Sequence, residues 1–363
     1  MRSIFDTTRL KRTVLKNRIV RSATWEQMAT DDGRLTDRLL DVYAELAKGG
    51  VGLIITSYSH ITDEHRPNRR MLGIYDDRGL EGYRALTERV HGHDCAIVMQ
   101  IVYGGTQSFM HPRDGVIPGP SAVAEMATGV VAREMTQTDI KSLSAAFRDA
   151  ALRAKDAGFD GVQLHCAHGY GLGQWLSPFH NRRQDRYGGS IQNRARIIIE
   201  TYEEIRRSCG EDFLIMIKIN SEDFVSGGAT FEDCRYVCAE LSRRGVDAIE
   251  ISGGIFAAEE DRRWARPGVN TPAHEGYFSS YAARIAEEVD APVILVGGLK
   301  SIEVLEALLA ETKISYFSMA RALMAEPDLV LRWKRGDRRT SRCISCNKCR
   351  HPEGNICILH SHF

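Results

Sequence analysis

The densest group of potentially reactive side chains in the chain is a pair of histidines followed closely by a tyrosine. His165, His168 and Tyr170 open the stretch HCAHGYGLGQWLSPFHNRRQDRYGGSIQNR, residues 165–194. Imidazoles can bind zinc, activate a neighbouring nucleophile or donate a hydrogen bond to an oxygen. A tyrosine, with an ordinary pKa of about 10, can donate a proton. Which of these roles the residues have depends on the helices and strands that position them.

Eight short apolar runs rich in β-branched residues recur along the chain. Each is followed by a loop and then by a helix-like pattern. Continuous apolar runs of this length are typical of parallel strands that are covered on both faces. The expected strands cover residues 17–22, 51–56, 96–101, 161–164, 214–219, 248–251, 292–296 and 314–317.

The segments between these runs have helical periodicity. In residues 139–157 apolar side chains recur at spacings of three and four, Thr138 or Asp139 can cap the start, and Gly158 can end the helix in a left-handed conformation. Strands alternating with helices predict an α/β fold, a single (β/α)8 TIM barrel. A doubly wound open sheet is the alternative, but no G-x-G-x-x-G motif follows any expected strand.

Two expected loops are unusually long. They follow the third and sixth strands and cover about residues 103–134 and 256–277. Loops of this length in a compact domain are commonly lids or binding loops, and a plain surface excursion is the alternative. We expect the barrel to occupy residues 1–335 and a cysteine-rich extension to occupy residues 336–363.

Polar residues and glycines gather at the carboxyl ends of the expected strands, where such barrels carry their chemistry. Gly254, Gly298 and the region of Ala320, with the Arg321 guanidinium, would form a phosphate-binding nest. Lys218 would add a fixed positive charge. The strand-end set comprises Ala23, Thr24, Gln100, His165, Lys218, Gly253, Gly254, Gly297, Gly298, Ala320 and Arg321.

Three alternatives compete with an oxygen-binding role for the two histidines. A zinc site needs about three protein ligands, and no carboxylate or further histidine falls at another strand end. A hydrolytic centre would use Cys166, but in an extended strand its side chain points away from that of His165. A packed structural pair is the third. We favour two donors to one carbonyl oxygen, with Tyr170 as the proton donor.

Together these groups suit a flavin with a phosphate tail. A reduced flavin is anionic at its N1–O2 edge, where Lys218 would stabilise the charge and Gln100 would bond the pyrimidine edge. FMN carries the phosphate that the nest requires. His165 and His168 would hold a conjugated oxygen and stabilise the developing enolate, while Tyr170 delivers the proton.

The stretch 165–194 resembles the signature H-x-A-H-G-Y…L-S-P…N-x-R-x-D-x-Y-G-G-S-x-x-N-R of the old yellow enzyme family of FMN-dependent ene-reductases. The resemblance continues through LKNRIVRSAT, DDGRLTD, GGVGLIIT, GPSAV and MARALMAEPDL, over roughly residues 1–335. It implies reduction of the C=C bond of α,β-unsaturated carbonyl compounds by NADH or NADPH through FMN, in a ping-pong cycle. It further implies FMN binding by Ala23, Thr24, Gln100, Lys218, Gly254, Gly298 and Arg321, an oxygen clamp of His165 and His168, and Tyr170 as the acid.

Several positions depart from the family pattern around the expected pocket. Trp25 and Tyr58 stand beside the expected flavin, where the family usually has small residues or, at the first position, a sulfur-bearing one. Ala320 replaces the usual glycine before the phosphate-binding arginine. Gly171 replaces a bulky apolar residue, a change that would widen the pocket. Trp264, in the second long loop, either lines the substrate channel or is simply packed.

Four of the nine cysteines lie in the last 21 residues, within RCISCNKCRHPEGNICILH. Cys343, Cys346, Cys349 and Cys357 offer enough thiolates for zinc or an iron–sulfur cluster, and thiols without a metal are the alternative. The segment CISCN resembles the cluster motif of the dienoyl-CoA reductase branch of the same family, although the third and fourth cysteines are spaced differently.

The remaining composition excludes several classes of function. Basic and acidic residues balance at 48 each, so the chain has no electrostatic footprint for nucleic acid. No apolar run approaches the ~18 residues of a membrane span, and no apolar signal run opens the chain. We expect a cytoplasmic enzyme with a small-molecule substrate and no nucleic-acid or membrane partner. Whether it forms a homo-oligomer stays open.

Three other functions are compatible with the same residues. A related flavoenzyme could act as an NAD(P)H oxidase or demethylase. A phosphate-binding barrel lyase or isomerase would need no flavin, and a non-catalytic flavin-binding subunit would use the cysteine tail as a partner contact. Tyr170 favours the alkene reaction because it supplies the proton that the product needs.

Overall fold

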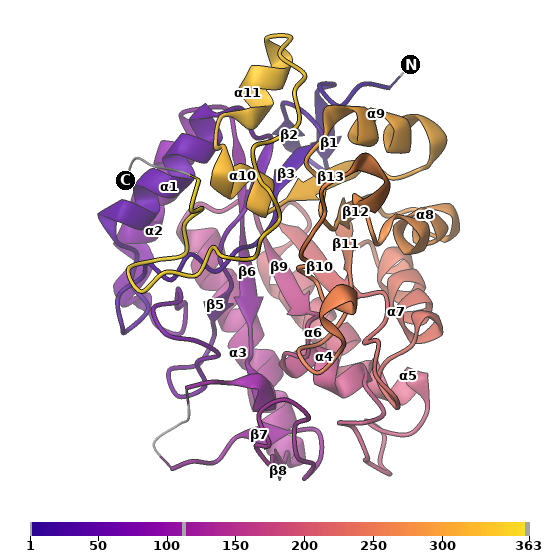
Figure 1. Cartoon of the computed structure of the whole chain (residues 1–363). Coiled ribbons are helices and arrows are strands. Elements are labelled where there is room, and N and C mark those ends of the chain that lie inside the picture. The colour runs from indigo at the N-terminus through magenta and orange to yellow at the C-terminus, as the bar shows by residue number, and fades with distance from the viewer. Residues whose placement is uncertain (1, 111–113, 360–363) are drawn as a thin grey trace.

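The computed structural model describes residues 2–110 and 114–359, so residues 360–363 of the expected extension lie outside the described part. The barrel strands are β3 (Ile19–Arg21), β4 (Leu53–Ile55), β6 (Ala96–Val102), β9 (Gly161–Cys166), β10 (Leu214–Asn220), β11 (Ala248–Ser252), β12 (Val293–Val296) and β13 (Tyr316–Met319). They follow the order β4-β3-β13-β12-β11-β10-β9-β6, and parallel pairing of β4 with β6 closes the ring (Figure 1). The (β/α)8 barrel expected from the sequence is confirmed.

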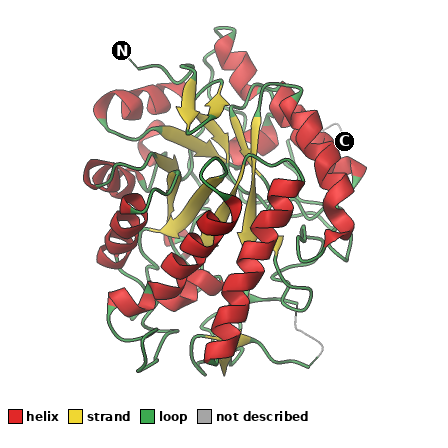
Figure 2. Cartoon of the chain, turned by 180° about the vertical axis from the view of Figure 1, so that it is seen from behind, coloured by secondary structure: helices red, strands yellow, loops and turns green. Residues whose placement is uncertain are grey.

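Helices surround the barrel, as the view from behind in Figure 2 shows. Their bounds are α1 (Asp37–Lys48), α2 (Leu80–His91), α3 (Gln137–Asp156), α4 (Gly171–Leu176), α5 (Ile191–Arg194), α6 (Arg196–Cys209), α7 (Phe231–Arg243), α8 (Ser279–Glu288), α9 (Ile302–Glu311), α10 (Arg321–Ala325) and α11 (Leu329–Lys334). The shorter elements are β1 (Thr8–Leu10), β2 (Thr13–Leu15), β5 (Ser59–His60), β7 (Pro118–Gly119), β8 (Arg133–Glu134), η1 (Asp77–Gly79), η2 (Gly105–Gln107), η3 (Glu260–Arg262) and η4 (Pro272–His274). None of the helices in the described ranges is long and apolar enough to cross a membrane.

Helix α3 begins earlier than the sequence predicts. Thr136, rather than Thr138 or Asp139, is its N-cap: Thr136 accepts a hydrogen bond from the Asp139 backbone, and the Asp139 carboxylate accepts one from the Thr136 backbone at 2.7 Å. This reciprocal capping box satisfies two backbone donors that a cap at either later residue would leave unpaired. Gly158 follows the helix with φ of +84°, as predicted.

An apolar plug closes one end of the barrel. The β1–β2 hairpin inserts Leu10 and Leu15 among side chains from the first halves of the strands, including Val20, Leu53 and Met216. In Figure 1 this hairpin lies at the opposite end of the molecule from β7 and β8. The polar interior therefore opens only toward the carboxyl ends of the strands, where the sequence predicts the chemistry.

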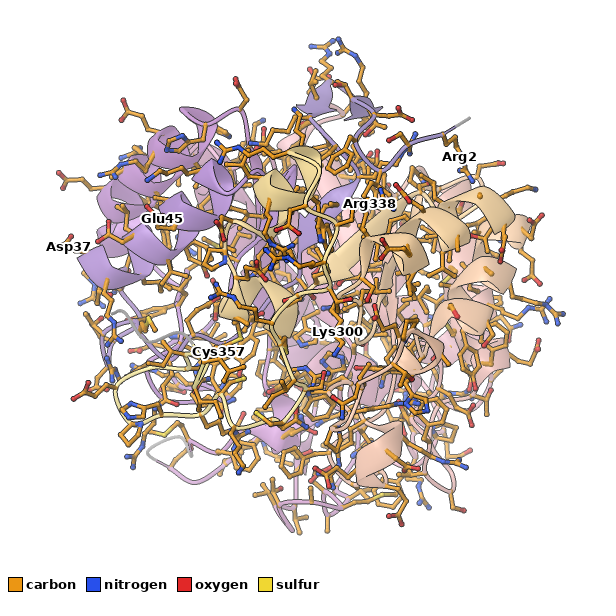
Figure 3. All side chains as sticks on the ribbon, turned by 45° about the horizontal axis from the view of Figure 1, so that its top comes forward. Arg2, Asp37, Glu45, Lys300, Arg338 and Cys357 are labelled. Atoms are coloured by element: carbon orange, nitrogen blue, oxygen red, sulfur yellow. The ribbon has the colours of Figure 1, made fainter. Side chains whose placement is uncertain are left out.

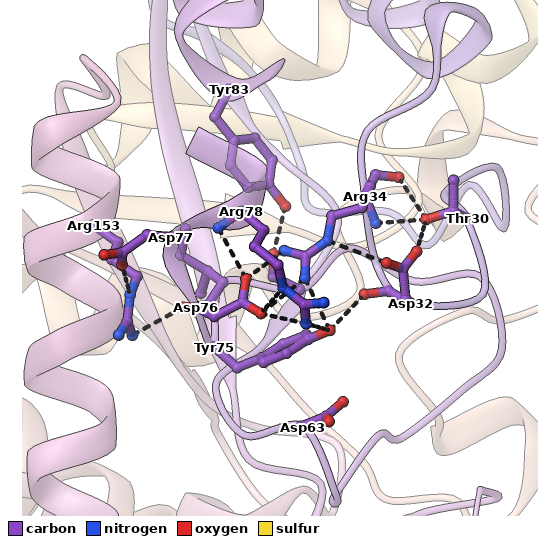
Figure 4. Close-up of polar contacts among 12 residues, drawn as sticks. Thr30, Asp32, Arg34, Asp63, Tyr75, Asp76, Asp77, Arg78, Tyr83 and Arg153 are labelled. Carbon is purple, nitrogen blue, oxygen red and sulfur yellow. Dashed lines mark hydrogen bonds and ion pairs between the residues drawn. The ribbon is translucent and has the colours of Figure 1, made fainter. Parts of the chain in front are cut away.

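Long loops rise from those carboxyl ends. The loops after β6 and β11 contain β7–β8 and η3–η4, which confirms the two long loops predicted from the sequence. A third long loop, residues 56–79 after β4, adds to the predicted fold. Arg34 ties it to the loop after β3, because its Nη1 lies 2.7 Å from Asp76 Oδ1 and its guanidinium 5.0 Å from the centre of the Tyr75 ring (Figure 4). The loop carries Tyr58 to the mouth of the barrel.

The chain after α11 forms an irregular tail that folds back over the barrel, drawn in yellow in Figure 1. Lys300, which Figure 3 labels beside the tail, donates from Nζ to the carbonyl oxygen of Cys343 at 3.1 Å. Arg38 of α1 donates to the carbonyl oxygen of Glu353 at 2.8 Å. These contacts bring the tail to the rim on which the long loops stand.

Candidate active site

Two adjoining cavities open at the carboxyl ends of the strands. One, of about 870 Å³, is lined by aromatic and polar side chains and is called the aromatic cavity; the other, of about 620 Å³, is bordered by Gly297 and Gly298 and is called the glycine cavity. The two cavities share Ala23, His168, Lys218, Trp264, Ala265, Ala320 and Arg321.

The structure brings most of the predicted site residues to these cavities. The aromatic cavity is lined by Ala23, Thr24, Trp25, Tyr58, Gln100, His165, His168, Tyr170, Lys218, Ala320 and Arg321, and the glycine cavity adds Gly297 and Gly298. Gly253 and Gly254 line neither cavity. A Cβ on Gly253 would lie 2.6 Å from Phe278, and one on Gly254 would lie 2.4 Å from the carbonyl oxygen of Arg262. Their small size serves the packing of the loop after β11, and their role toward a cofactor stays a prediction.

Gly171 also lies outside the lining of both cavities. A Cβ at this position would lie 2.5 Å from the ring of Tyr103. The glycine therefore makes room for a buried tyrosine and does not widen the pocket, contrary to the sequence-based expectation. Trp264 does line the cavities, and it is also packed.

His168 sits in an unusual backbone conformation that several hydrogen bonds maintain. Its φ is +61°, which is uncommon for a residue other than glycine. Its N–H donates to Asn220 Oδ1 at 3.1 Å, and its carbonyl oxygen accepts from Gln107 Nε2 at 2.7 Å. Its ring Nε2 lies 2.8 Å from Ser252 Oγ, and the Trp264 ring stacks on it at 4.8 Å between centroids. The imidazole is thus held in one orientation at the cavity edge.

His165 and Tyr170 face the same space as His168. The ring centroid of His165 lies 5.2 Å from that of His168 and 5.0 Å from that of Tyr170. Nδ1 of His165 is buried and has no hydrogen-bond partner among the described residues. A buried polar atom in this state calls for a ligand or a water molecule. The predicted oxygen clamp therefore has an unsatisfied ring nitrogen in place.

Burial sets the protonation of the three groups. Desolvation, with a smaller contribution from Lys218, holds the pKa of His165 well below its ordinary value. Desolvation does the same to the pKa of His168, with smaller contributions from His165 and Lys218. Burial raises the pKa of Tyr170. Near neutral pH both imidazoles are therefore neutral, each with one N–H donor, and the phenol keeps its proton.

A buried polar chain crosses the barrel beneath the cavities. Gln100 Nε2 donates to Gln163 Oε1 at 2.7 Å, and Gln163 Nε2 donates to Glu250 Oε2 at 2.8 Å. Glu250 Oε1 lies 3.2 Å from Lys218 Nζ and accepts a hydrogen bond from Ser22 Oγ at 3.0 Å. Lys218 stands opposite Glu250 in the β10–β11 register, which explains the pairing. The charge predicted at Lys218 is compensated inside the protein.

Gln163 and Glu250 are absent from the predicted site. A signal for them exists in the sequence, since each is a polar residue within an otherwise apolar strand, GVQLHC and AIEIS. A charge or amide at such a position needs a partner because it loses its water. The identity of that partner depends on strand order and register.

The glycine cavity combines a guanidinium with backbone in left-handed conformation. Gly297 and Gly298 have φ of +135° and +71°. Arg321 donates from Nη1 to the carbonyl oxygen of Arg266 at 2.8 Å and to Asn347 Oδ1 at 2.6 Å. A buried hydroxyl, Ser318 Oγ, lacks a partner among the described residues. The other residues that line it include Lys300 and Ser345. A guanidinium, an ammonium and a hydroxyl without a partner suit a phosphate group.

The zinc and hydrolase interpretations of the histidine pair find no support. Within residues 2–110 and 114–359, no group of three or more His, Cys, Asp or Glu side chains could hold a metal ion. Cys166 belongs to the apolar core, and burial raises the pKa of its thiol well above the ordinary value. It is therefore neither beside His165 on the cavity side nor a ready thiolate.

The predicted metal site in the tail is likewise not borne out. Cys343 and Cys357 are buried against Ala325, whereas Cys346 and Cys349 are half-buried. Burial is the main cause that raises the pKa of Cys349 to about 11, and the three other thiols of the tail add to the rise. The four thiols share one region, but the described side chains do not converge on a metal position. The tail is held by packing and backbone hydrogen bonds instead.

The sequence matches the NADH:flavin oxidoreductase / NADH oxidase family over residues 3–339. The chain belongs to this family. It is 35% identical over 350 residues to the NADH oxidase of Thermoanaerobacter brockii, covering 95% of the chain and 53% of that relative. It is 32% identical over 325 residues to an NADPH dehydrogenase of Geobacillus sp. (strain WCH70), covering 89% and 91%. The old yellow enzyme of Pichia sp. AKU4542 has the same fold, with a TM-score of 0.78 at 23% identity, covering 95% and 90%.

These relatives confirm the resemblance to the old yellow enzyme family. The chain spans about half the length of the NADH oxidase that it matches. Membership of the NADH:flavin oxidoreductase family implies FMN as cofactor and NADH or NADPH as reductant. The two cavities fit that cofactor, because unsatisfied buried atoms of His165 and Ser318 face a space bordered by the Arg321 guanidinium.

Proposed function

We propose that this chain is an FMN-dependent NAD(P)H oxidoreductase that reduces the C=C bond of α,β-unsaturated carbonyl compounds. FMN, when bound, supplies the hydride. The observation that carries the proposal is the arrangement of two neutral imidazoles, one buried and one half-buried, beside a protonated phenol. His165, His168 and Tyr170 line one cavity, and the ring centroid of His165 lies 5.2 Å from that of His168 and 5.0 Å from that of Tyr170.

The two imidazoles bind one carbonyl oxygen of the substrate. Because they are neutral donors in a buried site, they stabilise the negative charge that develops on that oxygen as the double bond is reduced. The hydrogen bond of His168 Nε2 to Ser252 and the stacked Trp264 ring hold its imidazole in place during the reaction. Tyr170 OH delivers the proton to the second carbon of the former double bond.

The polar chain beneath the cavities would hold the pyrimidine edge of the cofactor. Gln100 and Lys218 line the aromatic cavity from the barrel floor. Glu250 compensates the ammonium of Lys218, so that a flavin can bind next to the pair without an unbalanced buried charge. In the glycine cavity, Arg321 and Lys300 supply positive charge for the phosphate.

The Tyr170→Phe variant tests the proposal by separating the two halves of the cycle. We expect flavin reduction by NADH or NADPH to keep its rate, because the phenol takes no part in it. Reoxidation by an enone should slow by about 10²–10⁴-fold, the range of general acid catalysis. Stopped-flow absorbance of the flavin measures both half-reactions. Equal slowing of the two would refute the role of Tyr170.

Oxidation of NADH by dioxygen is a second candidate function, and the 35% identity to the NADH oxidase of Thermoanaerobacter brockii favours it. In that case reoxidation of the flavin needs no carbonyl clamp. Turnover with oxygen should then be equally fast in wild type and Tyr170→Phe, and a panel of unsaturated ketones and aldehydes should not compete with oxygen under air.

A further inference from the structure

We propose that Arg350, in the tail, binds a carboxylate group of the substrate. The preferred substrates are then α,β-unsaturated carbonyl compounds that carry a carboxylate at the end opposite the conjugated carbonyl. This inference rests on the proposed function, since it describes the other end of the molecule that the histidine clamp holds. Arg350 lines the aromatic cavity together with His165, His168 and Tyr170.

A short loop of the tail, residues 349–356, places Arg350 at the cavity. The backbone N–H of Ile356 donates to the carbonyl oxygen of Cys349 at 3.0 Å and closes this loop. Asn355 Nδ2 donates to the carbonyl oxygen of Trp25 at 2.6 Å, which fastens it to the loop after β3. Gly354 has φ of +139°, and a Cβ there would lie 2.7 Å from the Met28 side chain. The loop of the tail is therefore docked closely on the barrel rim.

The guanidinium of Arg350 lies over an aromatic wall of the cavity. Its central carbon is 6.0 Å from the centroid of the Trp25 ring, within reach of a cation–π contact. Trp25 packs against the cluster that contains Tyr58 and Tyr170. The Trp25 ring is itself held by its Nε1, which donates to the carbonyl oxygen of Arg69 at 3.1 Å. Arg350 thus lies over a fixed ring in the same cavity as the proton donor.

Arg350 has no polar partner among the described residues, unlike the other cations that line the cavity. Lys218 is paired with Glu250, and Arg321 is bonded to the loop after β11 and to Asn347. Arg350 makes no hydrogen bond or ion pair with any residue of the described ranges. Among those residues no Asp or Glu lines the aromatic cavity. An anion entering it therefore meets only positive side chains and neutral donors.

The position of Arg350 matches a substrate of a definite shape. Burial raises the pKa of Tyr170, and the positive charge of Arg350 is among the smaller influences that oppose this rise. The cation is therefore close enough to act on the site of proton transfer. Apolar rings line the same cavity, among them Phe109 and Phe256, whose ring centroids lie 5.8 Å apart. A flat apolar body with a carbonyl at one end and a carboxylate at the other complements this surface.

Matched phenols test the inference on the FMN-loaded protein without turnover. A phenol oxygen occupies the clamp and perturbs the flavin spectrum, so titration yields a Kd. The probes are 3- and 4-hydroxybenzoate, each compared with the corresponding hydroxybenzamide, which has the same shape and no charge. We expect the wild type to bind at least one hydroxybenzoate more tightly than the corresponding hydroxybenzamide. Arg350→Gln should reduce the ratio of the amide Kd to the acid Kd about fivefold, the effect of an ion pair worth ~1 kcal/mol.

Two control variants make the measurement specific. Arg350→Lys keeps the positive charge and should keep most of the ratio. Lys348→Gln removes a positive charge from the same exposed tail, at a residue that does not line the cavity, and should leave the ratio unchanged. Because each comparison is a ratio of ratios, differences in phenol acidity between acid and amide cancel.

The outcomes separate this inference from the proposed function. An unchanged ratio in Arg350→Gln, or an equal loss for acid and amide, would overturn the anion-binding role. A raised KM for NADH or NADPH with an unchanged phenol ratio would assign Arg350 to the phosphates of the reductant and overturn it as well. If no phenol perturbs the flavin of the wild type, the histidine clamp itself fails and the inference fails with it.

Discussion

Two of the three cations that line the aromatic cavity, Lys218 and Arg350, are held in opposite ways. Lys218 extends from β10, is 3% exposed and is paired with the fully buried Glu250. Arg350 extends from an irregular part of the tail, is exposed, and lies over the Trp25 ring with no acidic partner among the described residues. A charge inside the barrel loses its water, so the protein has to compensate it, whereas solvent does so at the rim. The positive charge of Lys218 inside the barrel is thus neutralised by Glu250, whereas the positive charge of Arg350 at the rim is available to a ligand.

The largest expected effect comes from breaking the pair on the floor. Glu250→Ala leaves the Lys218 ammonium buried without its partner, so the free energy of unfolding should fall by about 3–5 kcal/mol. Arg350→Gln should change it by less than about 0.5 kcal/mol, as for most surface substitutions. Urea denaturation of the two variants measures the contrast. The double variant Lys218→Met/Glu250→Leu should regain much of the loss, and similar losses in both single variants would contradict the contrast.

Lowering the pH should protonate the buried histidines and reduce stability, and it should leave the charge of Arg350 at the rim unchanged. Burial lowers the pKa of His60 to about 4 and holds those of His165 and His168 well below their ordinary value. The unfolded chain therefore takes up these protons first, and stability that is complete above about pH 6.5 is lost as the pH falls below it. We expect urea denaturation to show a loss of about 1–2 kcal/mol per histidine between pH 7 and pH 5.

The matched control for this pH dependence is His60→Gln, because His60 lines neither cavity. This variant should lower the slope of the free energy of unfolding against pH by the equivalent of one proton. An arginine keeps its charge throughout this range. The hydroxybenzoate preference should therefore hold between pH 8 and pH 6. A preference that changed in parallel with stability would place the anion beside a histidine instead.

Salt should weaken the contact at the rim more than the pair on the floor. The Debye length shrinks from roughly 14 Å at 0.05 M to about 4 Å at 0.5 M ionic strength, which screens exposed charges and leaves buried ones largely unaffected. We expect the hydroxybenzoate-to-hydroxybenzamide ratio to fall about threefold over this range, while the Kd of the hydroxybenzamide stays constant. Flavin titrations in chloride salts measure both, and a salt-independent ratio would argue against an exposed cation.

The smallest expected effect concerns the support of Arg350. Trp25→Leu keeps an apolar surface but removes the cation–π contact, which is worth about 0.5–1 kcal/mol at exposed sites. The preference for hydroxybenzoate should drop about twofold, less than in Arg350→Gln. Phe109→Leu, which changes another ring of the same cavity, is the control. A full loss of the preference in Trp25→Leu would show that the ring, rather than the charge, selects the ligand.

Much of the fold and of the clamp could be predicted from local patterns. Apolar runs identify each barrel strand, because strands covered on both faces admit few polar residues. His165, His168 and Tyr170 are recognisable because they come from one continuous stretch, in which strand β9 and the turn after it place all three on one side. The N-cap of α3 was missed because Thr136, Thr138 and Asp139 are all acceptable caps, and only the reciprocal bonds choose between them.

The partners of the buried charges could not be predicted in the same way. Glu250 and Lys218 are distant in sequence, and they meet because β10 and β11 are neighbours in a register that sets the two residues opposite each other. The four cysteines of the tail have a spacing suited to a metal, yet among the described residues they form no group that could hold one: Cys343 and Cys357 are buried against Ala325, and Cys346 and Cys349 are half-buried.

By itself the sequence determined the eight-strand barrel, the grouping of His165, His168 and Tyr170 after one strand, and the pair Gly297 and Gly298 after another, since each depends on residues that are neighbours along the chain. Only the tertiary structure decided which charges are paired and which stay available. Lys218 is compensated because closure of the barrel buries it beside Glu250, and Arg350 faces the cavity because the tail docks through Asn355 on Trp25. Both outcomes depend on contacts between distant segments, and desolvation gives those contacts their energy.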